Sequence, residues 1–205
     1  MNQSFFVPLR PEMENRYESS DLQEALRVLR RGGIVLYPTD TIWGIGCDAT
    51  NEEAVSKVFA LKQRADSKSM LVLVDSVARL ERYVDIPESA EQLLAVAEDS
   101  KPMTIIYPHA QGVAQELIAP DGSLGVRITR EAFSKALCAG LGKPIVSTSA
   151  NISGEPTAKT FAQISKAILN GVDYICHYRR NDNTPKQPSA IIKINTDNTF
   201  IIIRA

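Results

Sequence analysis

Apolar residues recur at helical spacing in several segments of the chain. In the first, SSDLQEALRVLRRGG, the leucines share one face, Ser20 is placed to cap the start, and Gly32 ends the helix. Asn51 is expected to cap the second helix. The remaining predicted helices cover residues 51–64, 87–99, 131–142 and 158–169, the last with Thr157 or Thr160 near its start.

Runs of apolar and β-branched residues between these helices predict strands. The predicted strands are 34–38, 69–75, 103–108, 124–129, 144–149, 173–178, 189–195 and 199–204. Helices and strands alternate almost to the end, which favours an α/β fold with helices packed on a twisted sheet. The last strands have no helices between them, so we expect a mixed sheet. The polar, proline-bearing residues 179–188 predict a loop, and we expect one domain over residues 1–205.

The composition is that of a globular protein with a formal net charge of −1. This charge argues against tight nucleic-acid binding through bulk electrostatics, because such binding depends on phosphate neutralisation. Cys47, Cys138 and Cys176 are widely spaced, which favours reduced thiols over a disulfide framework or a zinc site. No apolar run has the length of a signal peptide or a membrane span. We therefore expect a cytoplasmic protein.

The stretch YPTDTIWGIGCDA places polar side chains directly after a predicted buried strand. Thr39, Asp40 and Thr41 come first, and Gly44 and Gly46 follow. Glycine permits backbone conformations and close approaches that a side chain would block. The pattern is typical of backbone that passes close to another part of the protein or to a ligand.

A group of cations, Lys62, Arg64 and Lys68, follows the second predicted helix. One interpretation is a solvated helix end, since cations there interact favourably with the helix dipole. The other is a phosphate-binding group, because arginine supplies forked donors and lysine a point charge.

Hydroxyl groups and an amide follow the predicted strand PIVSTS. The stretch VSTSANISGEPT contains Ser147, Ser149, Asn151 and Thr157. Ligands of α/β folds sit beyond the carboxyl ends of strands, so this stretch is either a binding loop or a capped polar turn. Arg127, on another predicted strand, is expected either to pair with an internal carboxylate or to bind an anionic ligand.

Several common catalytic motifs are absent from the sequence. There is no G-x-x-x-x-G-K-[ST], no G-x-G-x-x-G after a strand and no G-x-S-x-G, and His109 and His177 are the only histidines. A reaction that depends on positioning and charge stabilisation therefore fits better than covalent catalysis.

Taken together, these motifs resemble one family. YPTDTIWGIG, KQR followed by Lys68, GVRI and STSANISG occur in the order and at spacings like those of the YrdC-like threonylcarbamoyl-adenylate synthases. The resemblance covers nearly the whole chain, from Ser20 to IIIRA. Its most specific part is the combination of K-x-R and S-x-N, here in KQR and SAN.

The resemblance implies a twisted α/β sheet with a large concave, partly basic cavity. Family members combine L-threonine, bicarbonate or CO2, and ATP, and they release L-threonylcarbamoyl-AMP and pyrophosphate. A separate transferase complex then moves the threonylcarbamoyl group to adenosine 37 of tRNAs. The resemblance thus implies a nucleotidyltransferase without a side-chain nucleophile, with Mg2+ held through the ATP phosphates.

The resemblance also implies roles for single residues. Positions similar to threonine ligands of the family are Thr39, Thr41, Arg127, Ser147 and Ser189. Positions similar to ATP ligands are Lys62, Arg64, Lys68, Ser123, Ser149, Asn151, Thr157 and Arg204.

The sequence departs from the family in several places. Many members have G-P-L-T where this chain has Lys101, Pro102, Met103 and Thr104, and many have Pro where it has Ala65. Position 68 is often Asn in longer members and is Lys in this chain. The sequence ends at Ala205, so we expect the short form, without the C-terminal domain of longer members.

Two alternative functions remain open from the sequence. One is an RNA-binding YrdC-like protein without synthase activity, and weak binding of tRNA or double-stranded RNA is compatible with a basic cavity. The intact S-x-N motif favours the synthase. The other is a carbamoyltransferase-type use of the same fold, but the zinc-finger-like and acylphosphatase-like segments of that context are absent from the sequence.

Overall fold

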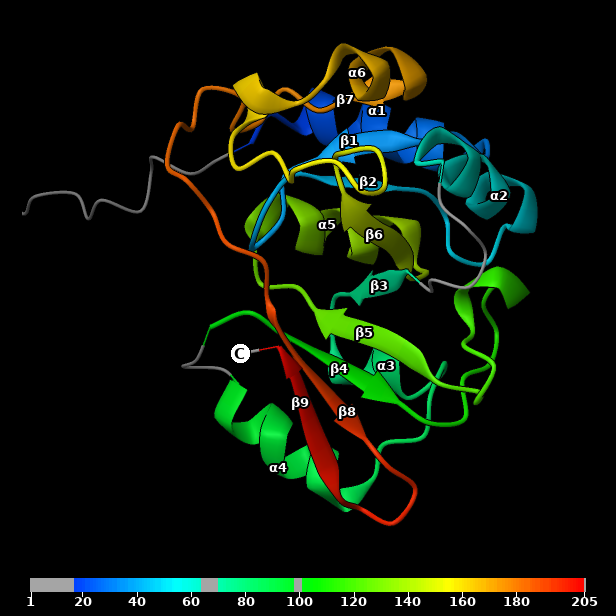
Figure 1. The fold of residues 1–205 in the computed structure, drawn as a ribbon. Helices are drawn as coiled ribbons and strands as arrows, with labels where there is room; N and C mark the ends of the chain where they lie inside the picture. Colours follow the sequence, from blue (N-terminus) through cyan, green and yellow to red (C-terminus); the bar gives the residue numbers. More distant parts are fainter. Residues whose placement is uncertain (1–16, 64–69, 98–100, 205) are drawn as a thin grey trace, which may run out of the picture.

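The computed structural model describes residues 17–63, 70–97 and 101–204. In this part of the chain, the strands form one nine-stranded sheet in the order β7-β1-β2-β6-β3-β5-β4-β8-β9 (Figure 1). The strands are β1 (Val35–Tyr37), β2 (Gly44–Gly46), β3 (Leu71–Val74), β4 (Met103–Tyr107), β5 (Leu124–Ile128), β6 (Ile145–Ser149), β7 (Tyr174–Ile175), β8 (Ala190–Ile194) and β9 (Phe200–Arg204).

The sheet is mixed, as the sequence predicts. Three neighbouring pairs, β1–β7, β3–β5 and β4–β8, are parallel, and the other pairs are antiparallel. The helices are α1 (Ser19–Arg30), α2 (Glu52–Leu61), α3 (Val77–Leu80), α4 (Glu88–Ala97), α5 (Ala132–Leu141) and α6 (Lys166–Gly171), with 3-10 turns η1 (Gln115–Leu117) and η2 (Phe161–Gln163). The predicted α/β fold is confirmed.

Helix termini follow the local chemistry at most ends. The side chain of Asn51 accepts a hydrogen bond from the Ala54 amide and caps α2, as predicted. The predicted cap at Ser20 is wrong, because α1 begins at Ser19 and its N-cap residue Glu18 makes no capping hydrogen bond. Gly142 ends α5 with a φ of 76°, a conformation that glycine adopts without steric cost.

The single helix predicted over residues 158–169 is wrong. The structure has the short turn η2, then an extended residue, Ile164, and then α6, which begins after Ser165. Ile164 is buried, and the ring of Phe161 packs on Trp43 with centroids 4.9 Å apart. Tertiary packing therefore overrides the helical propensity of this segment.

The glycine-bearing stretch contains a strand that the sequence pattern did not predict. Residues 44–46 form β2, which lies between β1 and β6. A Cβ atom at Gly46 would lie 2.1 Å from the Val146 carbonyl oxygen, so only glycine fits there. At Gly44, a Cβ atom would come within 3.1 Å of Thr39 and 3.2 Å of Ser147.

Buried apolar residues form clusters on the two faces of the sheet. On one face, α1 and α5 pack on Val35, Tyr37 and Leu73. On the other face, α2 packs on Leu36 and Val72. Alternating residues of a strand point to opposite faces, which explains the division.

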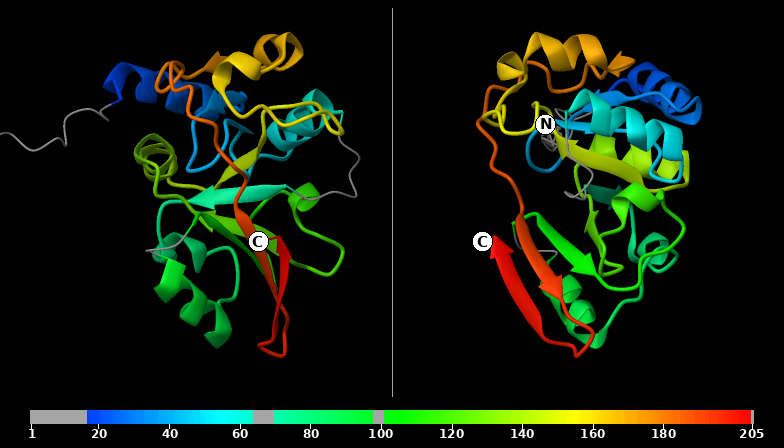
Figure 2. Two further views of the ribbon diagram at one scale, coloured as in Figure 1. Left: turned by 60° about the vertical axis from the view of Figure 1, so that its left-hand side comes forward. Right: turned by 45° about the vertical axis from the view of Figure 1, so that its right-hand side comes forward.

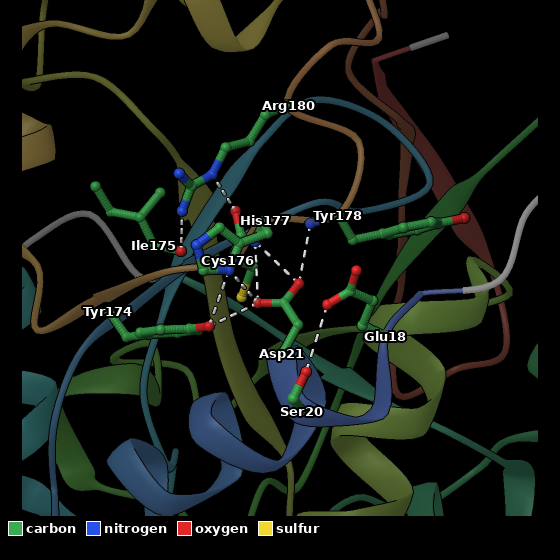
Figure 3. Close-up of polar contacts among 9 residues, drawn as sticks. All are labelled: Glu18, Ser20, Asp21, Tyr174, Ile175, Cys176, His177, Tyr178 and Arg180. Carbon is green, nitrogen blue, oxygen red and sulfur yellow. Dashed lines mark hydrogen bonds and ion pairs between the residues drawn. The ribbon is translucent and has the colours of Figure 1, made fainter.

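Between β7 and β8 the chain crosses the molecule without regular structure. Both views in Figure 2 show this segment running from the α6 end of the sheet to the β8–β9 hairpin. Its first residues are held by Asp21, whose carboxylate accepts hydrogen bonds from the backbone amides of His177 and Tyr178 and from the Tyr174 hydroxyl (Figure 3). Arg179 then donates to the Thr39 carbonyl oxygen at 3.3 Å. The segment therefore passes beside the loop after β1.

Candidate functional site

A cavity of about 660 Å³ opens on the face of the sheet that α1 and α5 cover further along. Leu73 on β3 packs in the α1–α5 cluster, and Leu71, on the same face, lines the cavity. The lining residues come from β2, β6, β3, β5, β4, β8 and β9 and from adjoining loops. The predicted site residues among them are Thr39, Thr41, Ser123, Arg127, Ser147, Ser149, Thr157, Ser189 and Arg204.

Arg127 on β5 is the cation at the centre of a hydroxyl cluster, and its side chain is 5% exposed. Nη1 donates to Thr41 Oγ1 at 3.1 Å, and Nη2 donates to Ser189 Oγ at 2.9 Å. Nε and Nη2 both donate to Thr104 Oγ1 at 3.1 Å. The cluster fixes the plane of the guanidinium beside the cavity.

The charge of Arg127 has no ion-pair partner among the residues that the structure describes. Burial lowers the pKa of Arg127, Asp40 and Tyr37 act in the opposite direction, and Arg204 adds to the lowering. The alternative in which Arg127 forms an internal ion pair is therefore not supported, because no carboxylate among the described residues pairs with it. A buried, oriented cation beside open space is suited to an anionic ligand group.

The two threonines of the opening motif are held in place next to Arg127. Thr39 Oγ1 donates to the Ile42 carbonyl oxygen at 2.7 Å and accepts from the Thr41 amide at 3.1 Å. Thr39 Oγ1 and Thr41 Oγ1 lie 3.2 Å apart. Both residues are buried, and both line the cavity.

Asp40, between them, points to other partners. Its Oδ1 accepts from the amides of Arg130 and Glu131, and its Oδ2 accepts from Thr129 Oγ1. Asp40 is not among the cavity-lining residues. The carboxylate of the motif therefore holds the loop after β1 against the start of α5, and the threonines on either side are thereby positioned.

The S-x-N motif lies at the end of β6. Ser149 lines the cavity, whereas Asn151 is buried behind it and is 9% exposed. Asn151 Nδ2 donates to the Glu155 carbonyl oxygen at 2.7 Å, and Asn151 Oδ1 is buried with no hydrogen-bond partner among the described residues. An unsatisfied buried amide oxygen is unusual, so Asn151 has acceptor capacity to spare at this turn.

Of the three predicted cations Lys62, Arg64 and Lys68, the structure describes Lys62. Lys62 is 1% exposed and does not line the cavity, so the interpretation as a solvated helix end is wrong for Lys62. Its Nζ donates to the carbonyl oxygens of Ser149 and Asn151, at 2.5 and 2.6 Å. Arg64 and Lys68 lie outside the described residues.

The far wall of the cavity is formed by the loop before β5 and by the β8–β9 hairpin. Ser123 Oγ donates to Asp121 Oδ1 at 2.6 Å, and Asp121 forms an ion pair with Lys193. Lys193 lowers the pKa of Asp121 to about 2, with help from Ser123. Arg204 Nε donates to the Ser189 carbonyl oxygen at 2.8 Å. The partly basic cavity thus has Arg127, Lys193 and Arg204 on its walls.

The described residues contain no group of three or more His, Cys, Asp or Glu side chains that could hold a metal ion. Asp121 is the acidic residue of the cavity lining, and it is already paired with Lys193. The described part of the chain also has no helix that is long and apolar enough to cross a membrane.

Sequence reasoning missed Thr104 and Lys193. Thr104 lies in the K-P-M-T stretch that departs from the family pattern, yet its hydroxyl accepts two hydrogen bonds from Arg127. The signal that could have found it was the strand itself, because alternation along β4 places Thr104 on the face that Arg127 occupies on β5. Lys193 gave no signal beyond its place in a predicted strand.

Comparison with known proteins decides the family. Residues 27–205 match the model of the Sua5_yciO_yrdC family, described as Telomere recombination. The chain is 37% identical over 155 residues to the threonylcarbamoyl-AMP synthase of Xanthomonas campestris pv. campestris (strain B100), covering 75% of this chain and 83% of that protein. The chain belongs to the Sua5/YciO/YrdC family.

Further relatives agree with this assignment. The threonylcarbamoyl-AMP synthase of Pseudoalteromonas translucida (strain TAC 125) is 33% identical over 176 residues, or 85% of this chain and 93% of that protein. The fold is similar to that of P. abyssi Sua5 complexed with L-threonine, with a TM-score of 0.81 and 24% identity. That alignment covers 92% of this chain and 55% of the Sua5 chain. A Sua5/YciO/YrdC fold is thus present over nearly all of the chain.

Proposed function

We propose that this protein is an L-threonylcarbamoyladenylate synthase, which makes threonylcarbamoyl-AMP and pyrophosphate from L-threonine, bicarbonate or CO2, and ATP. The observation that carries the proposal is Arg127, a buried cation that lines a cavity with hydroxyl partners and no ion-paired carboxylate among the described residues. Such a group is suited to an amino-acid carboxylate. Curated relatives named threonylcarbamoyl-AMP synthase, at 37% and 33% identity, support the same activity.

In this proposal, L-threonine binds at the Arg127 end of the cavity. The guanidinium holds the carboxylate, and Thr39, Thr41, Ser147 and Ser189 surround the rest of the amino acid. All of them line one cavity. The ligand of the Sua5 structure makes L-threonine the first amino acid to test.

ATP would occupy the other end of the cavity, against the S-x-N turn. Ser149 and Thr157 line this part, and Ser123, Lys193 and Arg204 lie on the opposite wall. Arg64 and Lys68 remain predicted phosphate ligands. Mg2+ would arrive with the ATP phosphates and offset their charge.

The reaction then needs no side-chain nucleophile. The threonine amine and CO2 give a carbamate with loss of a proton, or the amine and bicarbonate give the same carbamate with loss of water. A carbamate oxygen attacks the α-phosphorus, the bond to the β-phosphate oxygen breaks, and pyrophosphate leaves. The protein orients the two reactants and stabilises negative charge on carboxylate and phosphates. The product is an activated acyl-adenylate, which a tRNA-modifying transferase complex would consume.

The test is direct. The purified protein is incubated with ATP, labelled bicarbonate and L-threonine, and the products are analysed for a labelled adenylate and pyrophosphate. Formation of both, dependent on L-threonine, supports the proposal. If neither product forms and tRNA binds with a steep salt dependence, the RNA-binding alternative replaces it.

A further inference from the structure

Lys62 holds the turn of the S-x-N motif at two points. Lys62 is the C-cap residue of α2, and its Nζ donates to the Ser149 carbonyl oxygen at 2.5 Å and to the Asn151 carbonyl oxygen at 2.6 Å. The Lys62 carbonyl oxygen also accepts from the Ser153 amide at 2.9 Å. Side chain and backbone of one residue thus contact both halves of the turn over residues 149–153.

The turn also has hydrogen bonds between neutral groups. The Ala150 amide donates to the Trp43 carbonyl oxygen at 3.2 Å, and the Asn151 amide donates to the Ser149 carbonyl oxygen at 2.9 Å. Asn151 Nδ2 donates to the Glu155 carbonyl oxygen. Among these, the ammonium of Lys62 is the charged donor, and charge-assisted hydrogen bonds are about twice as strong as neutral ones.

The position of Lys62 separates it from the ligand space. Ser149 lines the cavity, but Lys62 does not, and its side chain is 1% exposed. Its two acceptors are backbone carbonyl groups of the turn whose first residue, Ser149, lines the cavity. The ammonium orients these carbonyls and offsets their partial charge.

We propose that Lys62 is a positioning residue, which shapes the 149–153 turn for the nucleotide and does not touch the nucleotide itself. The inference rests on the proposed function in one respect, because it takes the ligand of the turn to be ATP. It differs from the role that the K-x-R motif implies from sequence, in which Lys62 is a phosphate ligand.

Hydrogen exchange in the absence of any ligand tests the proposal. The variant Lys62→Met keeps the aliphatic stem and removes the ammonium, and Lys57→Met, on the exposed side of the same helix, is the matched control. We expect the amides of Asn151 and Ser153 to exchange at least tenfold faster in Lys62→Met than in Lys57→Met. Unchanged exchange in a folded Lys62→Met protein overturns the positioning role.

Binding measurements supply the second readout. In Lys62→Met, ATP affinity should fall about tenfold or more, while its salt dependence stays as in the wild type, because no phosphate contact is removed. A direct phosphate contact predicts a flatter salt dependence, and that result overturns the proposal. If the wild-type protein binds no ATP, the proposed function fails, but the exchange experiment still decides whether Lys62 holds the turn.

Lysine labelling of the wild-type protein decides the matter even if Lys62→Met does not fold. An acetylating reagent followed by mass spectrometry should leave Lys62 unmodified both with and without ATP. Reaction of Lys62 in the absence of ATP and protection by ATP would identify an accessible phosphate ligand and overturn the proposal. Lys57, whose side chain is 51% exposed, should react in both states.

Discussion

Arg127 and Lys62 are two buried cations that serve the same cavity in different ways. Arg127 lines the cavity and donates to three side-chain hydroxyls, of Thr41, Thr104 and Ser189. Lys62 lies behind the cavity wall and donates to two backbone carbonyls. Hydroxyl partners leave the guanidinium positive towards the open space, whereas the carbonyls direct the ammonium to the main chain.

The difference teaches that burial of a cation does not by itself mark a ligand contact. An arginine with a fork of donors can hold neighbours and ligand at once, because five N–H groups point in fixed directions. A lysine has one nitrogen with three donors, and two of them are already used by the turn. The comparison predicts that removing Arg127 acts on the ligand directly, and that removing Lys62 acts through the turn.

The largest effect should come from Arg127→Met. L-threonine that binds only the folded state raises stability by about 2.7 kcal/mol at a hundredfold excess over Kd. We expect the variant to lose this thermal shift entirely. The ligand-free protein should be as stable as the wild type or more so, since a buried charge without an ion pair is removed. Thermal-shift assays with L-threonine and D-threonine measure both effects.

Arg130→Met is the matched control, because Arg130 is exposed and lies two residues beyond the end of β5. Its threonine-induced shift should equal that of the wild type. A shift that persists in folded Arg127→Met would remove Arg127 from the threonine site. An equal shift with D-threonine in the wild type would do the same.

The sequence predicted which residues are involved in this comparison better than it predicted which groups their side chains contact. The motifs pointed to Thr41 and Arg127, the resemblance added Ser189, and the structure places all three on the wall of one cavity. The direction of Lys62 could not be predicted, since it depends on how the end of α2 packs on the turn after β6. A cation at a helix end and a cation under a turn have the same sequence signature.

Local sequence patterns predicted some helices and strands correctly and missed others. Long periodic helices such as α1 and α5 were predicted correctly, because their apolar faces are complete within the segment. The segment over residues 158–169 was not, because Phe161 and Ile164 are held by partners elsewhere in the chain. The strand β2 was missed since it has three residues and two of them are glycines.

The buried anion Asp21 can be compared with the two buried cations, because it lies away from the cavity. The carboxylate of Asp21 accepts three backbone or hydroxyl donors and lies away from the cavity (Figure 3). Asp21→Asn should therefore lower the free energy of unfolding by about 2–3 kcal/mol at neutral pH. The threonine-induced shift should be unchanged. Urea unfolding with and without L-threonine measures the two quantities.

The pH dependence of the Asp21 effect has a defined sign. Burial acts to raise the pKa of Asp21, but hydrogen bonds from His177, Tyr174 and Tyr178 outweigh it, and the pKa is lowered from 3.8. The stabilisation is therefore complete above the unfolded pKa and is lost as the pH falls through the folded pKa. The difference between wild type and Asp21→Asn should shrink below about pH 4. A difference that grows in acid would contradict this account.

A smaller effect is expected when a neighbour of Arg127 is changed. Thr104→Val keeps the shape of the side chain but removes the acceptor for Nε and Nη2 of Arg127. Threonine affinity should fall by about five- to tenfold, which corresponds to about 1 kcal/mol. Calorimetric titration measures the change. The control is Thr160→Val, because the Thr160 side chain makes no capping hydrogen bond. An unaltered threonine affinity in Thr104→Val would show that Ser189 and Thr41 suffice to orient the guanidinium.

The smallest effect should come from the ion pair across the cavity wall, between Asp121 and Lys193. Although Lys193 lowers the pKa of Asp121 to about 2, the two side chains are 52% and 30% exposed. Solvent screening therefore limits the coupling free energy of this ion pair to about 0.2–1 kcal/mol. A double-mutant cycle with Asp121→Asn and Lys193→Met should give a coupling free energy in this range at neutral pH. Since the folded pKa is depressed, the coupling should persist at pH 5 and disappear as the pH falls from about 4 towards 2. A coupling well above this range would mean that the far wall is as firmly ordered as the hydroxyl cluster around Arg127.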